Sequence, residues 1–201
     1  MTGKTHKLGG AIAGVLLLKL QREGSIEIAS VVITGSILGS LLPDIDHPKS
    51  CISRRLWFIA WPIEIMRWVV KQLTAALPGK ERKRINSIMG HRGITHSLLA
   101  CISVAAGMAA LGLILRTSLS GGYYKYYYCL VIAIVAGMLS HLFLDIFSNG
   151  VPLFCPFTMQ RVGFRWIKTG SMKEAVVGMF LVVLLIALIG KDGYAWIANK
   201  L

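Results

Sequence analysis

All five histidines and three of the four aspartates of this chain lie at or near the ends of long apolar stretches. His141 and Asp145 are four residues apart, so on a helix both side chains point to one face. Asp44, Asp46 and His47 form a second group, directly after an apolar block. Imidazole and carboxylate together suit zinc, manganese or iron better than calcium, which prefers oxygen ligands alone. These residues predict a divalent-metal site, with zinc as the favoured ion.

Further candidate ligands come from the N-terminus and from a motif with two histidines. His91 and His96 are five apart and would not share one face of a regular helix, so we expect His91 in a loop. Thr95 and Ser97 are then expected to cap the following helix or to donate hydrogen bonds to the ligands. The predicted metal ligands are His6, Asp44, Asp46, His47, His91, His96, His141 and Asp145.

Eight ligands exceed the four of a single tetrahedral site. The set therefore favours two ions, or one ion with a general base and supporting residues. Two ions about 4 Å apart would clamp and polarise a phosphoryl group and activate a water molecule. Asp44 and Asp46 are the predicted catalytic residues, as bridging ligand or base. Arg92 has the planar donor fork that suits a phosphate, so it is the predicted substrate-binding residue.

Each motif also has a purely structural explanation. His141 and Asp145 could form one satisfied hydrogen bond. Asp44 and Asp46 could be turn or helix-cap residues, because aspartate favours such positions. Arg92 could be an ordinary positive charge at the inner face of a membrane. The metal hypothesis depends on the whole set, because five of five histidines at predicted helix ends are improbable as scatter.

The elements that must position these ligands are membrane-spanning helices. The chain has 201 residues, of which 55% are apolar and 15% charged, against about 25% charged in soluble domains. A span needs about 20 mostly apolar residues. Four blocks meet or approach this length, and a shorter block at 8–20 is preferred as a span over an interfacial helix. A mixture of tryptophan, proline and charge predicts an interfacial helix at 56–70. The four blocks are residues 26–42, 94–115, 126–143 and 175–190.

The distribution of positive charge predicts which end of each helix faces the cytoplasm. The net charge is +13, and ten of the 22 lysines and arginines lie between Lys49 and Arg92. Such a loop stays in the cytoplasm and can contact anionic lipid head groups. Threading five blocks from an internal N-terminus then brings every histidine motif to the cytoplasmic face. We predict one all-α membrane domain over residues 1–201, with about four to five transmembrane helices and an interfacial helix in a basic cytoplasmic loop.

Several runs, in this order, resemble the YdjM family: LLPDIDHPKS at 41–50, GHRGITHSL at 90–98, SHLFLD at 140–145 and GVPL at 150–153. These bacterial inner-membrane proteins are described as LexA-regulated, metal-dependent hydrolases, and the resemblance covers roughly residues 4–175. It implies a multi-pass protein of the bacterial inner membrane with a link to the SOS response. His6 matches the N-terminal histidine of the family, and Glu174 belongs to a weaker element, so it is a further site candidate. The family is distantly similar to zinc-dependent phospholipase C and P1-type nucleases, which implies a phosphoester substrate.

The predicted function is a membrane-bound hydrolase that cleaves a lipid or lipid-linked phosphoester at the cytoplasmic face. One alternative is a metal transporter or sensor, which would hold its ligands near the bilayer midplane on discontinuous helices. Another is a non-catalytic membrane stress protein whose metal only joins helices. The expected partners are membrane lipids and the lipid-phosphate substrate. No specific nucleic acid is expected, because no recognition motif accompanies the basic residues.

Overall fold

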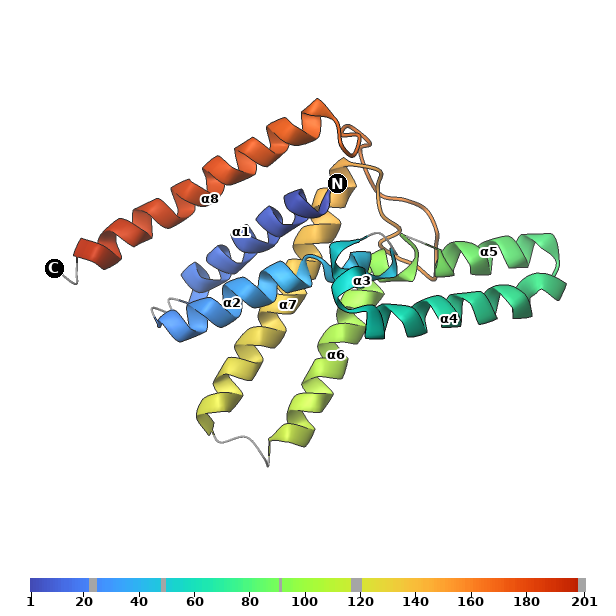
Figure 1. The fold of residues 1–201 in the computed structure, drawn as a ribbon, viewed down its shortest axis with the longest axis horizontal. Coiled ribbons are helices and arrows are strands. Elements are labelled where there is room, and N and C mark those ends of the chain that lie inside the picture. Colours follow the sequence, from blue (N-terminus) through green and yellow to red (C-terminus); the bar gives the residue numbers. More distant parts are fainter. Residues whose placement is uncertain (22–24, 48–49, 91, 117–120, 199–201) are drawn as a thin grey trace.

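The computed structural model describes residues 1–21, 25–47, 50–90, 92–116 and 121–198. Over these residues the chain forms eight α-helices, three short 3-10 helices and no strand beyond an isolated bridge between Val151 and Val162. Figure 1 shows their arrangement. The elements are α1 (Gly3–Gln21), α2 (Ile26–Gly39), η1 (Leu42–Asp46), α3 (Cys51–Arg55), α4 (Trp57–Leu73), η2 (Thr74–Ala76), α5 (Gly79–Met89), η3 (Ile94–His96), α6 (Leu98–Leu115), α7 (Gly121–Phe147) and α8 (Met172–Ala198).

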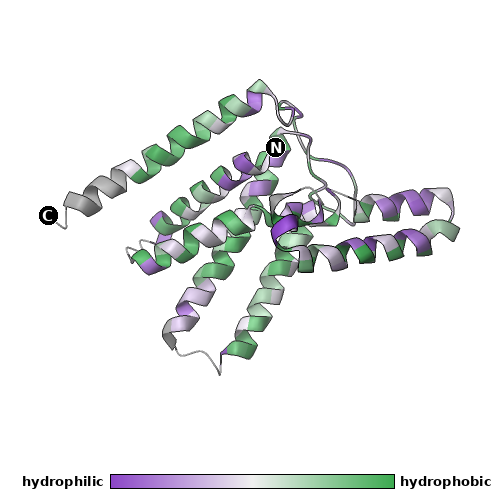
Figure 2. Cartoon of the chain, viewed as in Figure 1, coloured by the Kyte–Doolittle hydropathy of each residue, from purple (hydrophilic) through white to green (hydrophobic). Residues whose placement is uncertain are grey.

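Four segments are long and apolar enough to cross a membrane. A helix satisfies its own backbone hydrogen bonds, which is the condition for crossing hydrocarbon. The hydrophobic colouring of α2, α6, α7 and α8 in Figure 2 follows these segments. They correspond to the four blocks predicted from hydropathy, so the prediction of an all-α membrane protein is confirmed. The segments are Ile26–Asp46, Leu98–Leu115, Tyr123–Phe147 and Met172–Gly190.

Helix α1 is not among these four segments. Lys4, Lys7 and Lys19 lower its apolarity, although the helix is 19 residues long. It packs against α2, α7 and α8, and in Figure 1 it runs beside α2 in the opposite direction. That this helix crosses the membrane stays a prediction.

Helices α1 and α2 approach closely because glycine faces the neighbouring backbone. A Cβ atom built on Gly10 would lie 2.7 Å from the carbonyl oxygen of Ser36 and 2.7 Å from Ser40 Oγ. No real Cβ makes such a contact, so the helices would have to separate. Small residues at helix interfaces allow this kind of packing in membrane proteins.

Gly10→Ala is therefore expected to destabilise the protein by about 1–3 kcal/mol, since the added methyl overpacks the α1–α2 contact. The matched control is Gly107→Ala in α6, where a Cβ would meet nothing within 4 Å. At that position alanine should be neutral or slightly stabilising, because it has the higher helix propensity. Thermal unfolding of both variants in the same detergent measures the difference. Equal melting temperatures would contradict the close contact.

The ends of five helices meet at one end of the bundle. In Figure 1 the starts of α1, α6 and α8 and the ends of α2 and α7 converge there. Helix α7 packs against α1, α2 and α6. The loop after α7 returns to its last turn, where the carbonyls of Ile146 and Phe147 accept hydrogen bonds from Phe164, Trp166 and Ile167. These carbonyls have no partner within the helix, so the loop completes the helix end on which the site is built.

Helices α4 and α5 form a hairpin that extends away from the other helices (Figure 1). The segment predicted as an interfacial helix at 56–70 is α4, which continues to Leu73. Its tryptophans at 57, 61 and 68 are each more than 60% exposed, while Arg67 turns toward the bundle and is only 17% exposed. The position of this helix relative to the membrane stays a prediction.

Candidate metal centre

Five of the eight predicted ligands come together where the helix ends meet. His6 comes from α1, Asp44 from η1, His96 from η3, and His141 and Asp145 from α7. The ligand atoms of each of two groups lie within 4.8 Å of one another, and both groups contain His141. The three histidines and Asp145 are at most 1% exposed, whereas the Asp44 side chain is 20% exposed. The two groups are His6, Asp44 and His141, and His96, His141 and Asp145.

The atoms at the centre of the cluster form a ring of alternating nitrogen and oxygen. His96 Nε2 lies 3.4 Å from Asp44 Oδ1 and 3.9 Å from Asp145 Oδ2. His141 Nε2 lies 3.9 Å and 3.7 Å from the same two oxygens. Ligands about 2.0–2.1 Å from a tetrahedral zinc ion are about 3.3 Å apart. These four neighbouring separations are slightly longer than that spacing, and the four residues do not form one group within 4.8 Å, so each three-residue group is a candidate site by itself.

His141 has the hydrogen bonding of a metal ligand. Its Nδ1 lies 2.7 Å from the carbonyl oxygen of Ser40, which can only accept, so Nδ1 carries the proton and Nε2 a lone pair. Nε2 is buried and makes no hydrogen bond with the described residues. Buried polar atoms without a partner are rare, and metal-bound histidines typically donate their other N–H to a carbonyl or carboxylate. The donor set thus fits a divalent ion.

Close packing of α7 on α2 brings Ser40 to this histidine. A Cβ atom built on Gly137 would lie 2.7 Å from the backbone nitrogen of Ser40. One turn further along α7, the imidazole of His141 then reaches the Ser40 carbonyl. The ring of His6 stacks on that of His141, with 3.6 Å between ring centroids. The imidazole of His141 is therefore held by both α1 and α2.

Asp145 joins the ring to its surroundings through both oxygens. Oδ1 lies 3.4 Å from His6 Nε2 and 2.7 Å from the α-amino nitrogen of Met1. Oδ2 lies 3.2 Å from Arg92 Nη2. Arg92 has a φ of 60°, in the left-handed region that few non-glycine residues adopt and that often marks functional positions.

Asp46, predicted as a ligand or base, belongs to neither of the two ligand groups found among the described residues. Its Oδ2 accepts hydrogen bonds from Arg67 Nη2 at 2.8 Å and from Thr95 Oγ1 at 2.7 Å. Its carbonyl oxygen accepts from Arg67 Nη1 at 2.6 Å. Thr95 Oγ1 lies 3.1 Å from His96 Nδ1, so Asp46 supports His96 through Thr95. The catalytic role of Asp46 stays a prediction.

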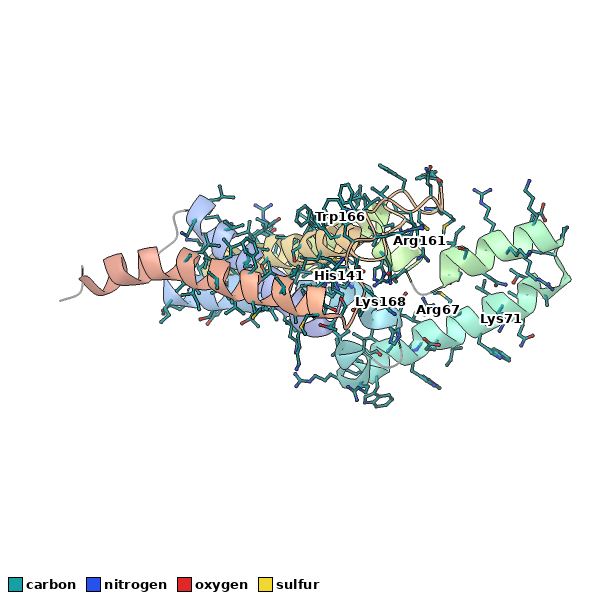
Figure 3. All side chains as sticks on the ribbon, turned by 90° about the horizontal axis from the view of Figure 1, so that it is seen from above. Arg67, Lys71, His141, Arg161, Trp166 and Lys168 are labelled. Atoms are coloured by element: carbon teal, nitrogen blue, oxygen red, sulfur yellow. The ribbon has the colours of Figure 1, made fainter. Side chains whose placement is uncertain are left out.

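Arg67 is a site residue that the sequence reasoning missed. It stands in a helix with other charges and aromatic residues, and no pattern separates it from an exposed arginine. In Figure 3 it lies part-way along the α4–α5 hairpin, nearer to His141 than Lys71 is. Thr95 and Ser97 serve as expected, because Ser97 caps α6 by accepting from the backbone nitrogen of Ala100 at 3.2 Å.

Glu174 is buried but does not belong to either metal-ligating group. Its Oε1 accepts hydrogen bonds from the backbone nitrogen of Thr2 and from Thr5 Oγ1, and its Oε2 accepts from the backbone nitrogen of Gly170 at 2.6 Å. Glu174 thus joins the start of α8 to the start of α1. Its partner Thr5 directly precedes the candidate ligand His6. His91 lies outside the described residues.

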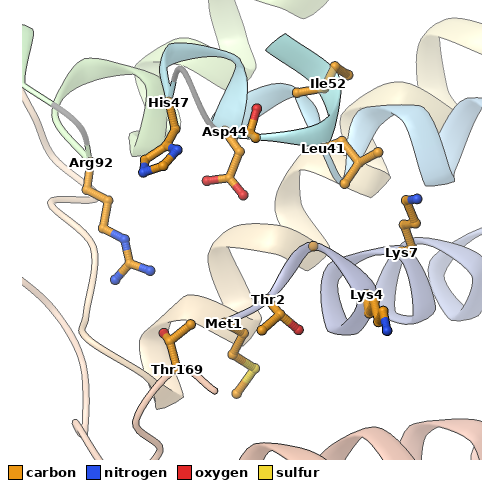
Figure 4. A pocket seen from close by; sticks show the side chains of 12 residues that line it. Met1, Thr2, Lys4, Lys7, Leu41, Asp44, His47, Ile52, Arg92 and Thr169 are labelled. Carbon is orange, nitrogen blue, oxygen red and sulfur yellow. The ribbon is translucent and has the colours of Figure 1, made fainter. Parts of the chain in front are cut away.

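A pocket of about 660 Å³ opens beside Asp44. Figure 4 shows Asp44 and His47 on one wall, Arg92 at one side and Lys4 and Lys7 at the other. Asp44 is the one carboxylate in the lining of this pocket, against the cations Lys4, Lys7 and Arg92, so the pocket favours an anion beside the candidate metal centre. The lining is formed by Met1, Thr2, Gly3, Lys4, Lys7, Leu41, Asp44, His47, Ser50, Ile52, Arg92 and Thr169.

Comparison with known proteins finds relatives over most of the chain. The profile of a family described as YdjM inner membrane protein matches residues 1–199. The protein named Uncharacterized protein YvsG from Bacillus subtilis (strain 168) is 28% identical over 178 residues, which cover 88% of this chain and 87% of that protein. Proteins named Inner membrane protein YdjM, from Escherichia coli (strain K12) and Shigella flexneri, are 32% identical over 157 residues, 76% of this chain and 63% of each relative. The alignment thus spans less than two thirds of those two relatives. No solved structure matches the chain.

Proposed function

Since the chain belongs to the YdjM inner membrane protein family, we propose that it is a membrane-bound, metal-dependent hydrolase acting on a lipid or lipid-linked phosphoester at the cytoplasmic face. The family confirms the predicted place in the inner membrane. The observation that carries the proposal is the buried Nε2 of His141, which has no hydrogen-bonding partner among the described residues. His141 belongs to both groups of three residues whose ligand atoms lie within 4.8 Å of one another.

The pocket supports a phosphoester as the substrate. A bound divalent ion would act as a Lewis acid on a phosphoryl oxygen. Arg92 lines the pocket and contacts Asp145, so its guanidinium can hold an anionic substrate next to the metal centre. Asp44 belongs to both the pocket and the ligand cluster. It is therefore the candidate base, within reach of a water molecule in the pocket.

Two observations favour hydrolysis over the alternatives. A transporter would hold its ligands on discontinuous helices near the bilayer midplane, whereas α7 is one continuous helix with His141 and Asp145 in its last two turns. A metal that only joins helices needs no access for a substrate, whereas here a pocket reaches Asp44.

The proposal is tested by elemental analysis of the purified chain. A screen then measures hydrolysis of lipid phosphoesters in the presence of added zinc, manganese or iron ions. We expect one or two ions per chain and hydrolysis that stops on chelation. Asp44→Asn should lower turnover by about 100-fold or more, since it removes the candidate base. The control Lys173→Gln changes an exposed residue of α8 outside the pocket and should leave turnover unchanged.

Other outcomes would favour the alternatives. Stoichiometric metal without hydrolysis of any ester would support the structural role. Uptake of the ion into proteoliposomes would support transport.

A further inference from the structure

The pocket beside the metal centre has cations on two separate walls. Lys4 and Lys7 lie at one side of Asp44, and Arg92 lies at the other, as Figure 4 shows. Arg92 is joined to the metal centre by its 3.2 Å contact with Asp145 Oδ2. None of the ion pairs described above occupies Lys4 or Lys7, and both side chains are exposed to the pocket.

The arrangement of the lysines follows from the helix that carries them. Lys4 and Lys7 are three residues apart on α1, so their side chains leave the helix from one face. In Figure 4 their ends extend in different directions, Lys7 toward Leu41 and Lys4 away from it, and the flexible four-carbon stems allow both to turn toward one anion. His6 lies on another face of the same turn and points into the ligand cluster, where it is 1% exposed. One turn of α1 therefore supplies both a metal ligand and two charges to the adjoining pocket.

We propose that Lys4 and Lys7 form a second phosphate subsite, and that the substrate is a lipid diphosphate rather than a lipid monophosphate. The inference rests on the proposed phosphoester hydrolase and names its substrate class. One phosphate lies between Arg92 and the metal centre, and the other lies against the two lysines. Leu41 and Ile52 line the same pocket and offer apolar contact to the first carbons of the lipid.

Charge complementarity favours two phosphates. A divalent ion balances the carboxylates of Asp44 and Asp145, so the side chains of Lys4, Lys7 and Arg92 and the α-amino group of Met1 leave about four positive charges. A phosphate monoester carries about −1.5 to −2 at neutral pH, and a second phosphoryl group adds about one more negative charge. The diphosphate comes closer to balancing this charge, whereas a monophosphate beside Arg92 leaves Lys4 and Lys7 without an anion.

The reaction is hydrolysis of the bond between the two phosphoryl groups. The oxygen of water forms a bond to the terminal phosphorus, and the bond from that phosphorus to the bridging oxygen breaks. The bridging oxygen remains on the lipid, which leaves as a monophosphate. The terminal group leaves as inorganic phosphate, and one proton passes to solvent. No oxidant, reductant or second substrate is needed.

The test compares a short-chain polyprenyl diphosphate with the corresponding monophosphate, on the purified chain in detergent micelles. Binding is measured by native mass spectrometry with and without zinc, and hydrolysis by release of inorganic phosphate. We expect the diphosphate to bind at least tenfold more tightly. Lys4→Gln with Lys7→Gln should raise the KM for the diphosphate about tenfold, keep kcat, and leave monophosphate binding unchanged. The control is Lys173→Gln, which should leave the binding and the hydrolysis of both lipids unchanged.

The result separates this inference from the proposed function. Preferential binding of the diphosphate that disappears in the double variant supports the subsite, even if no ester is hydrolysed and the hydrolase proposal fails. Equal binding of both lipids, or equal loss of both in the double variant, overturns the subsite even if hydrolysis is observed. Because the contacts are electrostatic, the preference should also weaken as salt is raised from 0.05 to about 0.5 M.

Discussion

His141→Ala is expected to lower the affinity for the divalent ion by about 100-fold or more, which leaves the purified protein without stoichiometric metal after dialysis against a weak chelator. Losing even a residue that supports a ligand typically costs 10–100-fold in affinity, and His141 belongs to both groups of ligand atoms. Asp145→Ala should give a similar loss, since its Oδ2 completes the ring with His141 Nε2 at 3.7 Å. Elemental analysis of the dialysed proteins measures both effects.

The matched control for His141→Ala is Leu142→Ala on the same helix. Leu142 is 2% exposed, so its truncation should cost about 2–5 kcal/mol of unfolding free energy. It removes no ligand, and the metal content should stay stoichiometric. If His141→Ala retained its metal, or if Leu142→Ala lost as much metal as His141→Ala, the cluster would not be the metal site.

Arg67→Met is expected to lower the free energy of unfolding by about 3–5 kcal/mol. Asp46 is 1% exposed, and the substitution removes both the hydrogen bonds and the positive charge that Arg67 gives to this buried residue. The other carboxylate beside Arg67 provides the control. Glu64 Oε1 lies 3.5 Å from Arg67 Nη1 but the Glu64 side chain is 45% exposed, so Glu64→Gln should change stability by less than about 1 kcal/mol. Denaturant unfolding in micelles measures the three proteins.

A substitution of Asp46 itself distinguishes its two possible roles, which are support of His96 and a direct part in the chemistry. Asp46→Asn should weaken metal binding about 10–100-fold, because Thr95 would lose a charged acceptor and hold His96 less firmly. Turnover at saturating metal should then largely recover. If Asp46→Asn instead abolished turnover and left metal affinity unchanged, Asp46 would act in the chemistry, as predicted from its sequence position.

Membrane helices were predictable because hydropathy is a local property of the chain. The four segments that can cross a membrane lie within or around the predicted blocks, and lipid demands about the same length of apolar helix in any fold. The observed helix boundaries differ from the predicted ones where local hydrogen bonds set the start of a helix. The block predicted at 94–115 begins as α6 only at Leu98, since η3 and the cap by Ser97 come first.

Residue type and spacing by themselves determined a membrane protein with histidines and aspartates at shared helix ends, because charge and hydropathy constrain each helix separately. Tertiary structure decided which of those residues meet. Asp44 and Asp46 are two residues apart, yet one faces the cluster and the other binds Arg67 from a helix that returns 21 residues later. The pocket needs α1, η1 and Arg92 in one place. Such side-chain directions depend on how helices pack, and packing is set by contacts between residues far apart in the chain.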